Sequence, residues 1–158
     1  PHIWLSPRLL KLQARTVADT LSAMDPAHQD DYQRNLGALR QKLDEVDQTI
    51  RTTLAPCRGR AFLVFHPAWG YFAEDYGLRQ LAIETEGKEP SDHELTELQQ
   101  KARSEGIQVI FVQRQTAGRS AVAIAEAIGG RTEVLEDLAH DVPASLLRTA
   151  RLLAESYR

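Results

Sequence analysis

Residues 107–112 read Ile-Gln-Val-Ile-Phe-Val and are the clearest candidate for a buried strand in this sequence. The run is almost entirely apolar, is rich in β-branched and aromatic residues, and follows the turn signal Glu105-Gly106. A helical pattern precedes it at 92–104 and another follows it at 117–128. A strand between two helices is the repeating unit of a parallel sheet, because parallel strands need a long connection between them.

The same alternation extends over residues 59–158. Apolar, β-prone runs that end in polar residues predict three further strands, at 60–65, 80–84 and 132–135. Helical patterns with glycine or proline at their ends predict the intervening helices, at 69–76, 92–104, 117–128 and 143–157. Four strand–helix units in succession predict an α/β fold, in which a four-stranded parallel sheet carries helices on both faces.

Residues 1–58 do not show this alternation of strands and helices and are predicted to be helical. Ser6-Pro7 is a helix start signal before an apolar pattern over 9–24, and Asp25-Pro26 repeats that signal. We therefore expect a second helix over about 26–54, or a bend near residue 25. At about 1.5 Å per residue this helix is on the order of 45 Å long, and its apolar stripe needs a long partner surface. It is either a brace between two lobes or a dimerisation helix.

The composition is that of an ordinary globular protein of 158 residues, with 42% apolar and 26% charged residues. It excludes collagen-like, disordered and disulfide-scaffold classes, and the single cysteine, Cys57, cannot form an intramolecular disulfide. With 19 Lys and Arg against 22 Asp and Glu, the net charge of −3 gives no electrostatic case for nucleic acid or an anionic membrane as a partner. The chain opens on PHIW at residues 1–4 without an initiator Met, so we expect it to be a piece of a larger protein.

Polar side chains follow each predicted strand. His66 follows the first, Glu84-Thr85 the second, Gln113 the third and Glu136-Asp137 the fourth. Because the carboxyl ends of parallel strands meet at one edge, where open sheets bind ligands, these residues predict a metal or polar-ligand site. The alternatives are a half-buried histidine and carboxylates that are polar only because water solvates them. Three other histidines are predicted to lie at the surface: His28, His93 and His140.

Catalytic motifs are mostly absent from the sequence. It contains no HExxH, no GxSxG, no GxGxxG and no P-loop. A metal-dependent hydrolase that uses Glu84 or Glu136 as its base is an alternative on the same rim. A second alternative is a helix-mediated interaction module, in which the apolar stripe of 26–54 forms an oligomer and the rim is inert.

Several motifs occur together and in order along the whole chain. They are PHIWLSP at 1–7, HPAWGYF at 66–72 with YGL at 76–78, GKEPS at 87–91, VIFVQ at 109–113, IGG at 128–130 and LEDLA at 135–139. In this combination the chain resembles the zinc/manganese-type (cluster A-I) substrate-binding proteins of bacterial metal ABC transporters. The motifs that contain histidine are the specific ones.

The resemblance implies two α/β lobes joined by one long rigid helix, with the metal held between the lobes. This chain would be the carboxyl-terminal lobe with the linking helix. The amino-terminal lobe, with the first histidine ligand and often a His-rich loop, would lie outside it. The implied function is a periplasmic or extracytoplasmic receptor that hands a metal ion to a membrane permease. Zinc is the expected ion, with manganese or iron as alternatives.

The resemblance also assigns metal ligands by position. His2 matches the histidine of the family's His-x-Trp-Leu-Ser-Pro motif, and His66 matches the histidine that opens the aromatic-rich motif. The last ligand in the family is a carboxylate, usually Asp before Pro-Leu. This chain reads Glu136-Asp137-Leu138 there, so Glu136 aligns best and Asp137 is its substitute. With two histidines and one carboxylate at most, we expect the chain to bind metal weakly by itself. Self-association through its long helix is a competing expectation.

Overall fold

Four parallel strands form the centre of the molecule, as the sequence predicts. They are β1 (Ala61–Val64), β2 (Arg79–Ala82), β3 (Val109–Val112) and β4 (Arg131–Val134), in the order β2-β1-β3-β4. The computed structural model describes residues 2–85, 87–114 and 119–158. The central position of β1 and β3 explains why both are buried along their whole length, whereas β2 and β4 at the edges are partly exposed.

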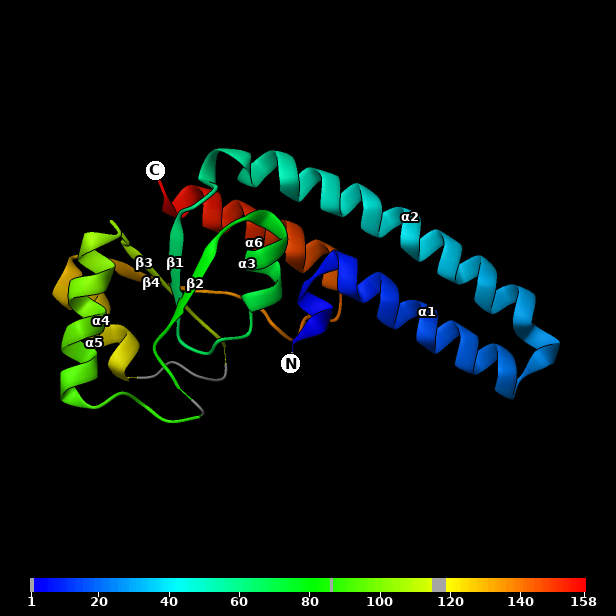
Figure 1. Ribbon diagram of the computed structural model, residues 1–158, viewed down its shortest axis with the longest axis horizontal. Helices are drawn as coiled ribbons and strands as arrows, with labels where there is room; N and C mark the ends of the chain where they lie inside the picture. The colour runs from blue at the N-terminus through cyan, green and yellow to red at the C-terminus, as the bar shows by residue number, and fades with distance from the viewer. Residues whose placement is uncertain (1, 86, 115–118) are drawn as a thin grey trace.

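Helices cover both faces of this sheet, and the alternation of side chains along β1 shows how. Phe62 and Val64 face a core cluster shared with α2 (Gln29–Leu54), α3 (Gly70–Tyr76) and α6 (Val142–Ser156). Leu63 faces a second cluster shared with α4 (Asp92–Ser104) and α5 (Arg119–Ile128). Successive strand residues point to opposite faces, so a strand with apolar residues at every position must be covered on both sides. Figure 1 shows α4 and α5 together on one side of the sheet.

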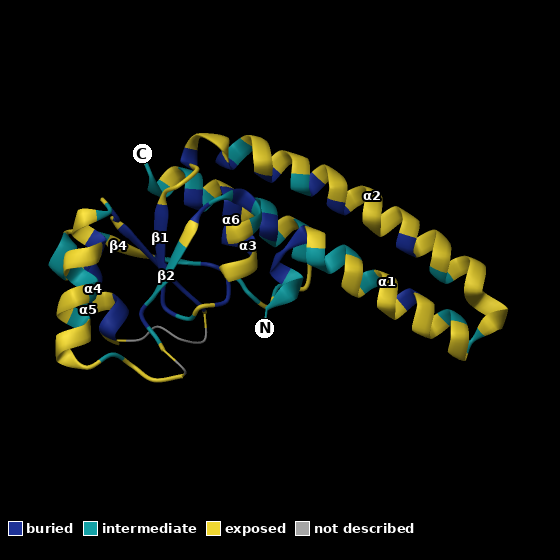
Figure 2. Ribbon diagram, in the orientation of Figure 1, coloured by how far each residue is buried: buried dark blue, intermediate teal, exposed yellow. Residues whose placement is uncertain are grey.

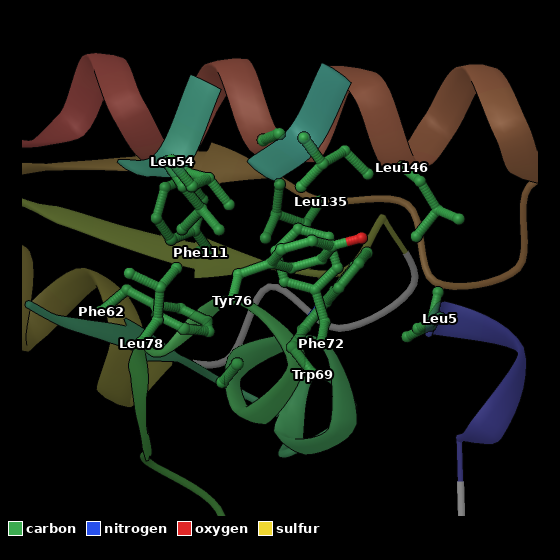
Figure 3. Close-up of a cluster of buried hydrophobic side chains, with 14 of the residues drawn as sticks. Leu5, Leu54, Phe62, Trp69, Phe72, Tyr76, Leu78, Phe111, Leu135 and Leu146 are labelled. Atoms are coloured by element: carbon green, nitrogen blue, oxygen red, sulfur yellow. The ribbon is translucent and has the colours of Figure 1, made fainter. Parts of the chain in front are cut away.

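The first core cluster is the larger of the two and joins the helices to the sheet. Three aromatic rings from α3 and its N-cap belong to this cluster: Trp69, Phe72 and Tyr76. In Figure 3 they lie between α3 and α6. Leu5 of the 3₁₀ turn Ile3–Leu5 contacts the same cluster, which attaches the start of the chain to the body.

The helical region forms a hairpin that projects from the body (Figure 1). Helix α1 (Pro7–Met24) ends at Asp25, a 3₁₀ turn covers Pro26–His28, and α2 then runs back along α1. Of the two alternatives, the structure confirms a second helix. The chain reverses direction near residue 25, and α2 begins at Gln29, after the proline turn, rather than at 26. The apolar stripe of α2 contacts α1 over its first half and α6 over its second half.

The projecting part of the hairpin is poorly covered, as Figure 2 shows. Met24 is 79% exposed and Val17 is 53% exposed. A groove of about 620 Å³ runs between α1 and α2, and its lining is mostly apolar: Trp4, Leu10, Gln13, Ala14, Val17, Ala18, Leu21, Tyr32, Asn35, Leu36 and Leu39. No helix within the described ranges combines the length and the apolar character that crossing a membrane requires.

Candidate metal centre

His66 lies just beyond the carboxyl end of β1, at the edge of the sheet where the sequence predicts a site. Trp69, three residues further along the chain, fixes the loop that follows His66. The side chain of Trp69 is buried, and its backbone amide donates to Oε1 of Gln80 at 2.6 Å. The amide of Ala68 donates to the carbonyl of His66 at 2.8 Å, which closes the turn. The side chain of His66 is therefore held at the rim by a buried anchor three residues away.

His2 reaches the same place from the start of the chain. The buried Ser6 caps α1, because its Oγ accepts from the amide of Leu9 at 3.1 Å. The same hydroxyl donates to the carboxylate of Asp75 in α3, which also pairs with Arg8 at 2.9 Å. Capping and pairing together fasten the beginning of α1 to α3, and this places His2 beside the His66 loop.

The two imidazoles meet through their Nε2 atoms. Nε2 of His2 lies 3.2 Å from Nε2 of His66, and the ring centroids are 5.0 Å apart. Two nitrogens bound to one tetrahedral zinc at about 2.0–2.1 Å are separated by about 3.3–3.4 Å. The observed separation therefore suits two corners of a single tetrahedral site.

Burial lowers the pKa of His2 below its ordinary value of 6.5, and the proximity of His66 lowers it further. Asp137 acts in the opposite direction, which places a carboxylate within electrostatic reach of His2. The lowered pKa favours the neutral imidazole, and the neutral form is the one that binds a metal ion.

Glu84 supports His66 from the other ring nitrogen. Its Oε1 lies 3.1 Å from Nδ1 of His66. The contact follows from the pairing of β2 with β1, because the amide of Glu84 donates to the carbonyl of Phe65 at 3.0 Å. The sequence predicts Glu84 at the rim, as part of a metal or polar-ligand site or as a base, but does not predict its contact with His66. The parallel register of 60–65 with 80–84 was the signal that could have paired it with His66.

The segment after β4 contains Glu136 and Asp137, the two carboxylates predicted as the third ligand. The Glu136 side chain pairs with Arg114, whose Nε lies 2.8 Å away. The indole of Trp4 donates to the backbone carbonyl of Asp137 at 2.7 Å, which ties the segment to the residue two positions after His2. Across residues 2–85, 87–114 and 119–158, no three His, Cys, Asp or Glu side chains gather closely enough to hold a metal ion. The two histidines are together, and the third ligand remains a prediction.

The remaining rim residue, Gln113, is buried behind His66. Its Nε2 donates to the carbonyl of His66 at 3.4 Å, and its Oε1 has no partner among the described residues. The other histidines are exposed, as predicted: His28 contacts Asp25, and His93 and His140 face solvent.

Comparisons with known proteins identify the family to which the chain belongs. A family model described as "Zinc-uptake complex component A periplasmic" (ZnuA) matches residues 1–150. The chain is 32% identical over 140 residues to "High-affinity zinc uptake system protein ZnuA" of Bacillus subtilis (strain 168), covering 87% of this chain and 44% of that protein. It is 33% identical over 141 residues to "Zinc-binding lipoprotein AdcA" of Streptococcus pneumoniae (strain R6), covering 87% of this chain and 28% of that protein.

Solved structures give the same result. A crystal structure of ZnuA superposes with a TM-score of 0.97 at 42% identity, over 100% of this chain and 62% of that chain. A Zn(II)-bound variant of AdcAII from Streptococcus pneumoniae superposes with a TM-score of 0.89 at 26% identity, over 100% of this chain and 60% of that one. The chain thus spans between about a quarter and two thirds of these relatives. The match over residues 1–150 and the shared fold show that this chain belongs to the family of the periplasmic zinc-uptake component ZnuA.

Proposed function

We propose that this chain is the metal-holding portion of a receptor that binds zinc outside the cytoplasm and delivers it to the permease of an ABC transporter. The observation that carries the proposal is the separation of 3.2 Å between the Nε2 atoms of His2 and His66. The relatives named for zinc uptake and zinc binding support zinc as the cargo. The words "periplasmic" and "lipoprotein" in the names of the family and of a relative support the compartment.

The ligand chemistry favours zinc over its competitors. Two imidazole nitrogens and one carboxylate are borderline ligands that suit a tetrahedral zinc ion. Manganese is favoured as oxygen ligands replace nitrogen, and iron also accepts imidazole. We propose Glu136 as the third ligand, with Asp137 as its substitute. Glu136 must then exchange Arg114 for the ion, whereas Asp137 already acts on His2 electrostatically.

A transport role explains the rim better than catalysis does. The family consists of metal-binding transport receptors, which are not a class of enzyme. We propose that this chain likewise has no catalytic activity. Glu84, one of the two candidate bases, contacts His66 Nδ1 and so supports an imidazole instead of facing an open position. A receptor must capture and later release its ion, which needs ligands but no general base.

We further propose that, in the complete protein, a second lobe covers the groove between α1 and α2, and that this lobe corresponds to the part of the relatives outside the match. The chain matches 62% of the ZnuA structure and 44% of the Bacillus subtilis protein, so each relative has a large part left to pack elsewhere. The groove is apolar and begins at Trp4, close to His2. An additional lobe in this position would lie beside the metal centre and could supply a further ligand.

Titration calorimetry with zinc tests the proposed function. We expect zinc to bind wild type more weakly than nanomolar affinity, because the described residues supply few ligands, and we expect His66→Ala to abolish binding. His93→Ala is the matched control, since His93 is an exposed histidine far along the chain on α4. Equal binding by wild type and His66→Ala would contradict the proposal. Parallel titrations with manganese and iron establish the order of preference.

A further inference from the structure

Glu84 is the one carboxylate in contact with an imidazole of the candidate centre, as far as the described residues show. Its side chain is only 14% exposed, and its backbone is fixed by the hydrogen bond from its amide to Phe65. A hydrogen bond to a carboxylate strengthens as water is excluded from it. The backbone of Glu84 is therefore held just beyond the end of β2, next to the residue that precedes His66, and its side chain is largely buried.

The contact determines which nitrogen of His66 carries the proton. A carboxylate only accepts hydrogen bonds, so the 3.1 Å contact with Oε1 of Glu84 requires a proton on Nδ1 of His66. A neutral imidazole has a single N–H, so Nε2 of His66 then presents a lone pair. That lone pair is directed at the position 3.2 Å away where Nε2 of His2 lies.

We propose that Glu84 is a positioning residue, which holds His66 in the Nδ1–H form so that its Nε2 is free to bind the ion shared with His2. The proposal rests on the proposed zinc-binding function and adds to it a residue that does not touch the ion. Carboxylates that accept from the second nitrogen of a ligand histidine fix its orientation and raise its basicity as a ligand. Gln113 has a different role, because it donates a hydrogen bond to the backbone carbonyl of His66 and does not contact the imidazole ring.

The chain contains its own control for this contact. His93 and Glu97 on α4 also form a His–Glu pair. However, Nδ1 of His93 lies 3.7 Å from Oε2 of Glu97, and both side chains are exposed. That distance is too long for a hydrogen bond. We therefore expect His93 to have no imposed tautomer and to report on the solvent-exposed state in the same sample.

The first arm of the experiment uses nitrogen-15 NMR of the imidazoles at about pH 8, where unperturbed histidines are neutral, without zinc. We expect His66 in the Nδ1–H form in wild type and in Glu84→Gln, because glutamine retains an acceptor oxygen. Glu84→Ala is expected to release His66 from the Nδ1–H form to the tautomer state of the exposed His93, whereas Glu97→Ala leaves His66 unchanged. An Nε2–H form of His66 in wild type, or an Nδ1–H form that persists in Glu84→Ala, would overturn the proposal.

The second arm measures zinc affinity of the same variants. We expect Glu84→Ala to lower affinity roughly 10- to 100-fold, Glu84→Gln to lower it less, and Glu97→Ala not to change it. Unchanged affinity in Glu84→Ala, with the tautomer altered, would overturn the link between Glu84 and metal binding. If wild type binds no zinc at all while the tautomers are as expected, the proposed function fails and the assignment of Glu84 to His66 stands. Thermal melting of each variant confirms that the fold is retained.

Discussion

His66 is contacted at both ring nitrogens, by Glu84 on one side and by His2 on the other. The family resemblance predicted that both histidines bind one ion, but residues 64 positions apart gave no means of predicting which ring atoms would meet. The contact depends on Ser6 and Asp75, which fasten α1 to α3. The pairing of Glu136 with Arg114 was equally beyond prediction, because Arg114 lies in a turn after the end of β3 and the direction of its side chain is set by tertiary structure.

Acidification should release zinc from this centre. The metal binds the neutral imidazole, so protons compete with it as pH falls through the ordinary histidine pKa of about 6.5. The pKa of His2 is lowered by burial, and His2 therefore stays available to the ion at a pH where an exposed histidine is already charged. We expect zinc affinity to fall between about pH 7.5 and 5, and to fall less steeply in His2→Ala, which has one competing proton fewer. Affinity that is constant over this range would argue against histidine ligands.

The same shift affects the stability of the metal-free fold. The unfolded chain binds a proton at His2 more readily than the folded chain does, because the folded pKa is the lower one. The contribution of His2 to stability is therefore complete above about pH 6.5 and decreases as pH falls from that value towards the lowered pKa. His2→Ala removes this part of the pH dependence.

The elements of the sheet were predictable because their signals are local. The strands β1 and β3 are continuous apolar runs, and such runs indicate strands covered on both faces. The reversal at Asp25-Pro26 was not predictable, since a cap followed by proline is compatible with a bend or with a new helix. The contacts between α1 and α2 decide the outcome, and they are long-range.

The hydroxyl of the buried Tyr76 connects α3 to α2. The Tyr76 hydroxyl donates to Oδ1 of Asp47 in α2 at 2.8 Å, and Arg51 pairs with the same carboxylate at 3.0 Å. Burial and the bond to Asp47 raise the pKa of Tyr76, so the phenol stays neutral and remains a donor.

We expect Tyr76→Phe to lower the free energy of unfolding by about 1.5 kcal/mol, because a buried hydrogen bond to a charged acceptor is lost. Urea denaturation measures this. Tyr71→Phe is the matched control on the same helix, since Tyr71 is exposed and its hydroxyl makes no hydrogen bond among the described residues. Equal losses in the two variants would show that the Tyr76–Asp47 bond contributes nothing specific.

At the scale of the whole molecule, the α/β body is well covered and the hairpin is not. The sequence indicated an apolar stripe longer than one lobe requires, and the structure shows the resulting groove between α1 and α2. Its occupant could not be inferred from the stripe, because a second lobe and a second copy of the chain bury the same kind of surface.

If a further lobe normally covers the groove, the chain alone should be a monomer that binds the apolar dye ANS there. We expect Val17→Asn to weaken dye binding without lowering the melting temperature, because Val17 is already exposed. Val122→Asn is the control, since Val122 is a similarly exposed valine on α5, away from the groove. Sedimentation velocity over a concentration series completes the test. A dimer that Val17→Asn disperses would show that a second copy of the chain covers the groove instead.

The measurement that tests the central claim most directly is a crystal structure of the zinc-loaded protein, with the ion located from its anomalous scattering. The account predicts one zinc ion bound to Nε2 of both His2 and His66 at about 2.0–2.1 Å. A carboxylate from Glu136 or Asp137 should complete the set, and Glu84 should remain on Nδ1 of His66. An ion that binds elsewhere, or that contacts only one of the two histidines, would contradict the account.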